Sequence, residues 1–223
     1  MRTAAFSLIQ HVETYLRALM AYRLGARDPL IHTKPGLLTI DHGEDYDRWI
    51  RDLDKKIRDS REEYIMHHRS HRDSVVPIWV AVGVLDWGSL SHLYNCAPIA
   101  VRDEVADCFG ISAAQVKTWL RALNVVRNVC AHHGRFFNRY YALTPKLPRR
   151  GWNDSLDAIG PVKDTTFAML TLLQHLSSHT RGASVSILPA TLRSFPTSSG
   201  LTVGALGVLP AWEELALWRK QLT

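Results

Sequence analysis

Residues 112–139 read SAAQVKTWLRALNVVRNVCAHHGRFFNR, and this stretch decides the fold of the chain. Ser112 is followed three residues later by Gln115, which is the spacing of a capping box at the start of a helix. Apolar residues then recur at the spacing of one helical face: Trp119, Leu123 and Val126. The sequence therefore predicts a long helix over residues 113–137.

Polar residues form a second stripe on the same helix. Asn128 and His132 are four residues apart and share a face. Asn124 lies four residues before this pair, and Arg135 lies three residues after it. Arg127 is offset from His132 by about 140° around the helix, although its long side chain can reach the same side. The helix thus gathers amides, an imidazole and guanidinium groups on one side.

The remainder of the chain also has the periodicity of helices joined by loops. Further helices are predicted over residues 6–24, 45–68, 77–95, 97–110, 162–179 and 211–221. We expect an all-α helical bundle, organised as one domain over residues 1–223. Its parts would be core helices over 5–138, a loop over 139–161, and C-terminal helices over 162–221. Residues 182–210 are rich in Ser, Thr, Gly and Pro, so they predict a long irregular excursion before the last helix.

Composition excludes several classes of protein. Of the 223 residues, 46% are hydrophobic and 22% are charged, which is typical of a globular protein and not of a disordered one. There is no apolar run long enough to span a membrane, so no membrane association is expected. The three cysteines are odd in number and widely spaced, which disfavours a disulfide framework and favours a cytoplasmic location. A histidine cluster lacks a fourth ligand at the right spacing, so no metal site is predicted there: His67, His68 and His71.

Positive charge is concentrated in one segment. The chain carries 27 basic and 21 acidic residues, for a net charge of +6, and residues 108–153 contain no Asp or Glu. A clustered basic face is typical of a nucleic-acid binder, and arginine is well suited to phosphate. The candidate contacts to an RNA backbone are Arg121, Arg139, Lys146, Arg149 and Arg150.

The residues from Arg127 to His132 have the pattern R-N-x-x-x-H, which resembles the motif of the HEPN superfamily of helical ribonucleases and nucleotide-binding domains. The wider string VRNVCAHHGRFFNR resembles the signature of the Abi-like, or abortive-infection, family within that superfamily. Other segments that resemble this family are residues 60–68, 77–79, 88–94, 119–120 and 209–212. The resemblance covers roughly residues 5–145 and the last helix.

The resemblance implies a HEPN-like bundle and a metal-independent endoribonuclease with no cofactor, acting as a toxin in phage defence. It also implies a homodimer in which two motifs form a composite active site, and it leaves open a cognate antitoxin, either protein or RNA. In this scheme the 2′-hydroxyl of RNA attacks the adjacent phosphate. His132 would act as acid or base, Arg127 would hold the phosphate, and Asn128 would orient them. Further candidates for catalysis or RNA binding are His133, Arg135 and Asn124.

Other interpretations of the same residues stay open. Residues 105–119 fit a helix-turn-helix in which Ser112, Gln115 and Lys117 would contact DNA. A catalytically inactive HEPN protein that binds a partner would carry the same fold. Arg127 and His132 could also be structural, as a salt bridge and a packed histidine at a helix end. His133 could face solvent, and Arg135 and Asn138 could fix the following loop.

Overall fold

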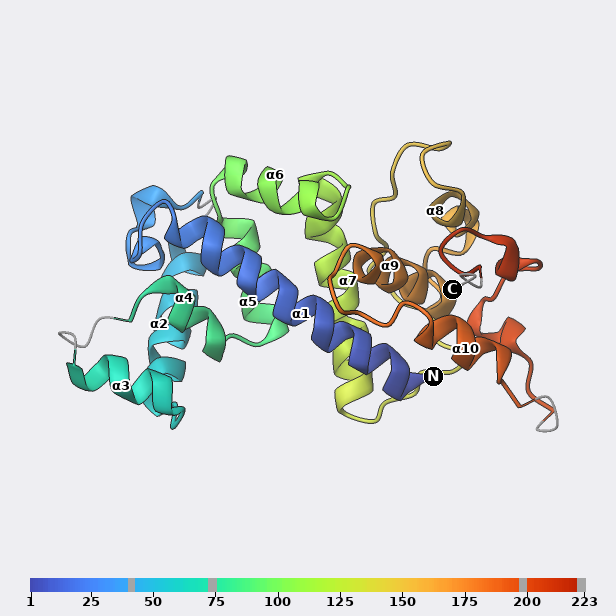
Figure 1. Ribbon diagram of the computed structural model, residues 1–223, viewed down its shortest axis with the longest axis horizontal. Helices are drawn as coiled ribbons and strands as arrows, with labels where there is room; N and C mark the ends of the chain where they lie inside the picture. The colour runs from blue at the N-terminus through green and yellow to red at the C-terminus, as the bar shows by residue number, and fades with distance from the viewer. Residues whose placement is uncertain (40–42, 72–75, 197–199, 220–223) are drawn as a thin grey trace. The chain divides into compact units, whose positions relative to one another are not determined.

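The computed structural model describes residues 1–39, 43–71, 76–196 and 200–219 (Figure 1). Within these ranges the regular structure is helical and there is no β-strand, apart from an isolated antiparallel bridge between Tyr140 and Thr165. The predicted all-α fold is confirmed. The α-helices are α1 (Arg2–Gly25), α2 (Gly43–Asp59), α3 (Glu63–His71), α4 (Ile78–Ala81), α5 (Trp87–Cys96), α6 (Ile99–Cys108), α7 (Ala113–Ala131), α8 (Asp154–Ala158), α9 (Thr166–Ser178) and α10 (Ile187–Arg193). Short 3₁₀ helices are η1 (Ile31–Thr33), η2 (Pro35–Leu37), η3 (Val82–Val84), η4 (Gly160–Val162), η6 (Val203–Leu206) and η7 (Trp212–Glu214).

The chain divides into two compact units. The motif unit combines Met1–Glu13 with Cys108–Thr223, and the N-terminal unit is Thr14–Asp107. Helix α1 supplies its first half to the motif unit and its second half to the N-terminal unit. The expectation of a single domain over residues 1–223 stays a prediction. Of the helices in the described ranges, none combines the length and the apolar character that crossing a lipid bilayer requires.

The N-terminal unit is built on the amphipathic helix α2. Its buried side chains fall at the spacing of one helical face and are Tyr46, Trp49, Leu53 and Ile57. Helix α2 packs against η3, and α3 packs against α4. The carboxylate of Asp86 caps α5 by accepting a hydrogen bond from the Ser89 backbone N–H at 2.8 Å, and it also pairs with Lys56.

The core of the motif unit is helix α9, which packs against both α7 and α8 (Figure 1). Its residues from Thr166 to Ser177 are all buried, and two of the polar ones bond to backbone carbonyls elsewhere in the unit. Thr166 Oγ1 donates to the Phe136 carbonyl at 3.0 Å, and His175 Nε2 donates to the Phe109 carbonyl at 2.9 Å. These bonds offset the desolvation of the buried polar groups and fix the ends of α6 and α7 on the core.

Two predicted helices are interrupted in the structure. The helix expected over 45–68 breaks after α2, where the Glu62 backbone N–H donates to Ser60 Oγ at 3.3 Å. A serine hydroxyl that competes for backbone groups in this way ends a helix. The helix expected over 77–95 is split into α4, η3 and α5, because Asp86 provides a new N-cap, and Pro77 stands just before α4 as its N-cap residue.

The C-terminal predictions need correction as well. The helix expected over 211–221 is wrong for the described residues, which form only η7 and turns up to Arg219. Trp218 is fully buried instead: its ring stacks on Phe167 with centroids 4.9 Å apart, and its Nε1 donates to Thr171 Oγ1 at 3.1 Å. This burial outweighs the local helical pattern.

The two segments expected to be irregular each contain a helix. Helix α8 lies within 139–161, and α10 lies within 182–210. Helix α10 forms because it buries Leu188 and Leu192, and because its Pro189 lies in the first turn, where a missing N–H costs nothing. Composition alone did not reveal these short helices.

Candidate functional site

Helix α7 presents a continuous polar stripe. The predicted capping box is present, because the Gln115 backbone N–H donates to Ser112 Oγ at 3.4 Å and the Ser112 backbone N–H donates to Gln115 Oε1 at 2.8 Å. The opposite side of the helix packs into the core through Trp119, Leu120, Leu123 and Val126. The residues of the stripe, all exposed or half-buried, are Lys117, Arg121, Asn124, Asn128 and His132. The stripe contains basic and neutral polar side chains and no acid.

The helix ends earlier than its sequence pattern predicts. Its last residue is Ala131, and exposed His132 is the C-cap, with its backbone N–H donating to the Asn128 carbonyl at 2.9 Å. His133 adopts a left-handed conformation with φ 53°, and the Gly134 N–H closes the end by donating to the Val129 carbonyl at 2.8 Å. This six-to-one bond is the signature of a Schellman motif. The predicted helix over 132–137 is therefore wrong, but His132 keeps its place at the end of the stripe.

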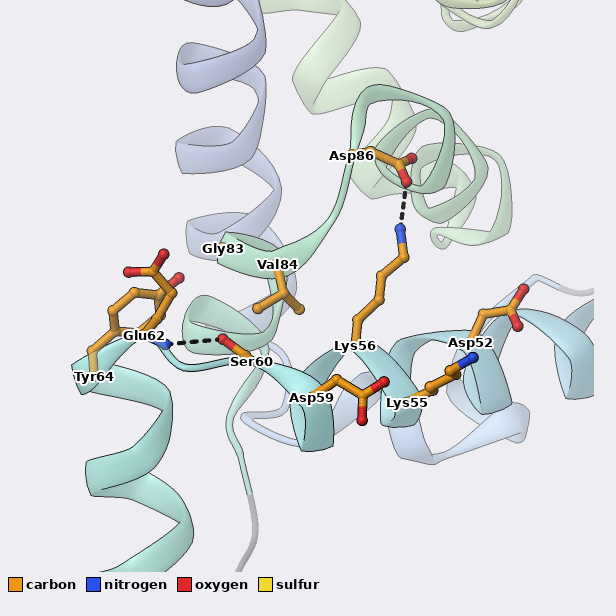
Figure 2. Close-up of a pocket in the computed structure, with 10 residues that line it drawn as sticks. All are labelled: Asp52, Lys55, Lys56, Asp59, Ser60, Glu62, Tyr64, Gly83, Val84 and Asp86. Atoms are coloured by element: carbon orange, nitrogen blue, oxygen red, sulfur yellow. Dashed lines mark hydrogen bonds and ion pairs between the residues drawn. The ribbon is translucent and has the colours of Figure 1, made fainter.

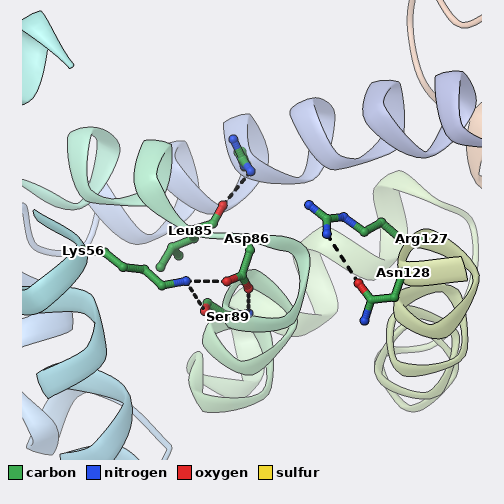
Figure 3. Close-up of polar contacts among 7 residues, drawn as sticks. Lys56, Leu85, Asp86, Ser89, Arg127 and Asn128 are labelled. Carbon is green, nitrogen blue, oxygen red and sulfur yellow. Dashed lines mark hydrogen bonds and ion pairs between the residues drawn. The ribbon is translucent and has the colours of Figure 1, made fainter. Parts of the chain in front are cut away.

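Arg127 lies beside the stripe rather than on it (Figure 3). Its Nη1 donates to Asn128 Oδ1 at 3.4 Å, so the arginine and the amide of the motif meet. The side chain is half-buried, and within the described ranges its Nε atom is shielded from water and has no hydrogen-bond partner. The guanidinium has therefore lost part of its hydration, which strengthens its attraction for an anion.

The residues after the helix have separate roles. Arg135 is exposed but lies outside the helix, so it does not extend the stripe as the periodicity predicted. Arg139 folds back: its Nη1 donates to the Arg135 carbonyl at 3.3 Å, and its guanidinium lies 5.4 Å from the centre of the Tyr141 ring. Asn138 has a left-handed backbone with φ 47°, which suits a turn residue. Arg139 therefore helps to hold this loop in place.

The basic loop that follows is fastened to α7. The Lys146 backbone N–H donates to Thr118 Oγ1 at 3.0 Å, and the Lys146 carbonyl accepts from Trp119 Nε1 at 2.7 Å. The side chains of Lys146, Arg149 and Arg150 are exposed. The structure thus fastens this basic loop to the amino-terminal half of α7, and it leaves His132 and His133 at the other end of the helix.

Two buried groups of the motif unit are poorly suited to chemistry at neutral pH. Burial raises the pKa of the Cys130 thiol to about 11, so this thiol is not a nucleophile. Burial lowers the pKa of His175 to about 4, so this imidazole, which contacts the Trp119 ring, is neutral at pH 7. The exposed stripe, rather than the core beneath it, therefore carries the groups that can meet a substrate.

Two residues of this unit were missed at the level of sequence. Arg2 Nη1 donates to the Gly134 carbonyl at 3.4 Å, so it supports the end of α7 from a position 132 residues away. Trp152 is 50% exposed, and the sequence predicted no role for it. Neither feature depends on neighbouring residues in the sequence. The Arg2–Gly134 bond results from long-range packing, and the exposure of Trp152 depends on which side of its turn faces solvent.

The N-terminal unit contains a pocket of about 690 Å³ (Figure 2). Its charged lining residues are Asp52, Lys55, Lys56, Asp59, Glu62 and Asp86. The Lys56–Asp86 pair holds the pKa of Asp86 at about 2, although burial alone would raise it. Across the described ranges, no group of three His, Cys, Asp or Glu side chains is arranged to hold a metal ion. The Lys56–Asp86 ion pair therefore already joins two of the charged residues that line this pocket.

A family model described as Abi-like protein matches residues 1–138, which is well over half of the chain. The chain belongs to the Abi-like family. The match includes the whole R-N-x-x-x-H pattern and the stripe on α7. Membership suggests a function of the abortive-infection type and is compatible with a nuclease. No curated protein and no solved structure matches this Abi-like chain.

Proposed function

We propose that this Abi-like protein is a metal-independent endoribonuclease of the HEPN type, with the R-N-x-x-x-H motif of α7 as its active site. The observation that carries the proposal is the exposed stripe without acids, which ends at His132 and in which Asn128 contacts the half-buried Arg127. A polyanion can lie along such a stripe without electrostatic repulsion. The stripe ends in a histidine, the side chain most often used for general acid–base catalysis.

The chemistry follows from these side chains. A base removes the proton of the RNA 2′-hydroxyl, and the 2′-oxygen forms a bond to the adjacent phosphorus. The bond from phosphorus to the 5′-oxygen breaks, and an acid protonates that oxygen. The products are a 2′,3′-cyclic phosphate and a free 5′-hydroxyl. His132 supplies acid or base catalysis, Arg127 stabilises the charge on phosphorus, and Asn128 orients Arg127 through the 3.4 Å contact.

One motif supplies one such histidine, while the reaction needs two proton transfers. We therefore propose a homodimer in which two copies of the motif form one composite site. This arrangement can be tested by mixing inactive His132→Ala protein with the parent in varied proportions at a fixed total protein concentration. If both histidines are needed, mixed dimers are inactive, and the activity falls as the square of the parent fraction. A linear dilution of activity would show that each protomer works alone.

The cleavage test uses purified protein with transfer RNA and messenger RNA in EDTA, followed by analysis of the product ends. His132→Ala should lower the cleavage rate by about 10²–10⁴-fold while leaving RNA binding nearly intact, because this is the usual contribution of a general acid or base. Arg127→Ala should lower both the rate and the affinity, because it also holds the phosphate before the reaction. His133→Ala should be milder than either.

The matched control is His11→Ala, which removes another exposed histidine of the same unit, on α1. It should cleave like the parent. Cleavage by His132→Ala at the parent rate would overturn the proposal. So would cleavage that stops in EDTA and returns with magnesium, since the scheme assigns the work of a metal to Arg127 and His132.

DNA binding through a helix-turn-helix is less well supported. Gly110 does turn the chain between α6 and α7 with φ 63°. However, Ser112 and Gln115, which would have to contact bases, are hydrogen-bonded to each other in the capping box. A double Arg127 and His132 variant that binds duplex DNA as tightly as the parent would favour this alternative.

A further inference from the structure

The basic loop after α7 contains a rigid turn formed by residues 149–152. The Trp152 backbone N–H donates to the Arg149 carbonyl at 3.2 Å, and Gly151 has φ +88° at the third position, as a type II turn requires. The Gly151 N–H donates to Asp157 Oδ2 at 2.6 Å, which ties the turn to α8. The backbone of the turn is therefore held by one bond within the turn and by a second bond to α8.

Trp152 leaves this turn half exposed. Its ring lies 5.7 Å from the buried His175, and His175 also meets the fully buried Trp119 at 5.4 Å. The buried side of the indole thus contacts the His175 ring, while 50% of the residue is exposed to solvent. A half-exposed indole that rests on an aromatic neighbour has surface left on which a further ring can stack.

The charges around Trp152 indicate an anionic partner. Arg149 and Arg150 are exposed on the turn itself, and the exposed side chain of Lys146 precedes them. The nearby carboxylates are occupied by backbone groups: Asp157 by Gly151, and Asp154 Oδ2 by the Ala216 N–H at 3.3 Å. An aromatic ring flanked by cations is the arrangement that binds single-stranded nucleic acid.

We propose that Trp152 stacks on an unpaired base of single-stranded RNA while Arg149 and Arg150 contact the flanking phosphates. This inference rests on the proposed function, because it adds a binding subsite for the same RNA. Trp119 and Trp152 both contact the His175 ring. Trp119 lies thirteen residues before His132, which is about 20 Å along α7. Trp152 therefore binds RNA several nucleotides from the cleaved bond, and it selects unpaired strands, because a paired base has no free face for stacking.

The test measures binding by fluorescence anisotropy in the His132→Ala background, so that the RNA stays intact. The probes are an unstructured fluorescein-labelled oligoribonucleotide and the same strand annealed to its complement. Trp152→Ala should weaken single-strand binding by about 5- to 150-fold, which corresponds to the loss of one stacked base. Trp152→Phe should restore most of the affinity, and duplex binding should change little.

The matched control is Trp79→Ala, because Trp79 is also 50% exposed but belongs to the N-terminal unit. It should bind like the parent. If Trp152→Ala and Trp152→Phe both bind the single strand as the parent does, the subsite is wrong, whether or not the parent cleaves RNA. If light scattering shows that Trp152→Ala converts a dimer to a monomer, the indole covers a protein interface instead, and the proposal is overturned.

The two proposals fail separately. Trp152-dependent binding of single strands by a protein that never cleaves RNA would support the subsite and refute the nuclease. Cleavage by the parent with no dependence on Trp152 would refute only the subsite. No binding of single-stranded RNA by the parent would refute both.

Discussion

Protonation of His175 should destabilise the motif unit at acid pH. The residue is only 2% exposed, and its Nε2 donates to the Phe109 carbonyl at 2.9 Å. Its Nδ1 is buried without a hydrogen-bond partner in the described part of the chain. If Nδ1 took up a proton, the new N–H would therefore have no acceptor. Burial, which is the main cause, and the nearby His179 lower the pKa of His175 to about 4.

The size and sign of the effect follow from linkage. In the unfolded chain His175 takes up its proton near pH 6.5, whereas in the folded chain it stays neutral down to about pH 4. The unfolded state binds the extra proton, so stability is complete above pH 6.5 and is lost as the pH falls toward 4. The two pKa values differ by an amount worth about 3 kcal/mol of unfolding free energy. Between pH 7.5 and 4.5 the expected loss is about 2–3 kcal/mol.

Urea unfolding at these two pH values, followed by circular dichroism, measures this loss. His175→Gln keeps an N–H donor for the Phe109 carbonyl and removes the titration, so the difference between the two pH values should shrink by about 2–3 kcal/mol. His11→Gln, at an exposed position, should leave the difference unchanged. An acid loss that is equally large in His175→Gln would refute the reasoning. His32 is buried too, with its pKa lowered to about 4, so part of the acid loss should persist in the variant.

Three further outcomes are expected. Gly207→Ala should destabilise the protein by about 2–5 kcal/mol in urea unfolding, because φ is +80° and the new Cβ would overlap the buried Thr165 side chain. Replacing both Arg149 and Arg150 with alanine should reduce the log–log salt slope of single-strand RNA binding by about 1.4, since each removes about one phosphate contact. Ser112→Ala should lower the unfolding free energy by about 1 kcal/mol through loss of the capping box.

Two of these outcomes have a control variant, and each has a result that would contradict it. Gly182→Ala carries a similar φ of +79° but meets nothing within 4 Å, so it should cost only about 1–2 kcal/mol. Equal losses in the two glycine variants would show that the Thr165 contact is irrelevant. An unchanged salt slope would show that Arg149 and Arg150 do not contact RNA phosphates. Ser194→Ala, at an exposed serine whose hydroxyl donates to the Thr191 carbonyl and caps no helix N-terminus, should cost less; a loss equal to that of Ser112→Ala would contradict the role of the cap.

Local chemistry made much of the motif unit predictable. The Ser112–Gln115 pair and the apolar spacing along α7 were sufficient to place its start, its buried face and its polar stripe, because a helix fixes neighbours three and four residues apart. The absence of acids from residues 108–153 predicted a basic surface in the same way. Those features depend on residues close together in the chain.

What the sequence alone determined is therefore the helical class, the family and the stripe that ends at His132. Tertiary structure decided where α7 ends, with His133 in the left-handed conformation and Arg2 bonded to the Gly134 carbonyl. It also buried Trp218, which replaced an expected helix with turns, and it left Trp152 exposed on its own turn. These outcomes depend on contacts between residues far apart in the chain. Such contacts can outweigh local preferences, because burying one aromatic side chain contributes about 1.5–3 kcal/mol, whereas helix propensities differ by less than about 1 kcal/mol per residue.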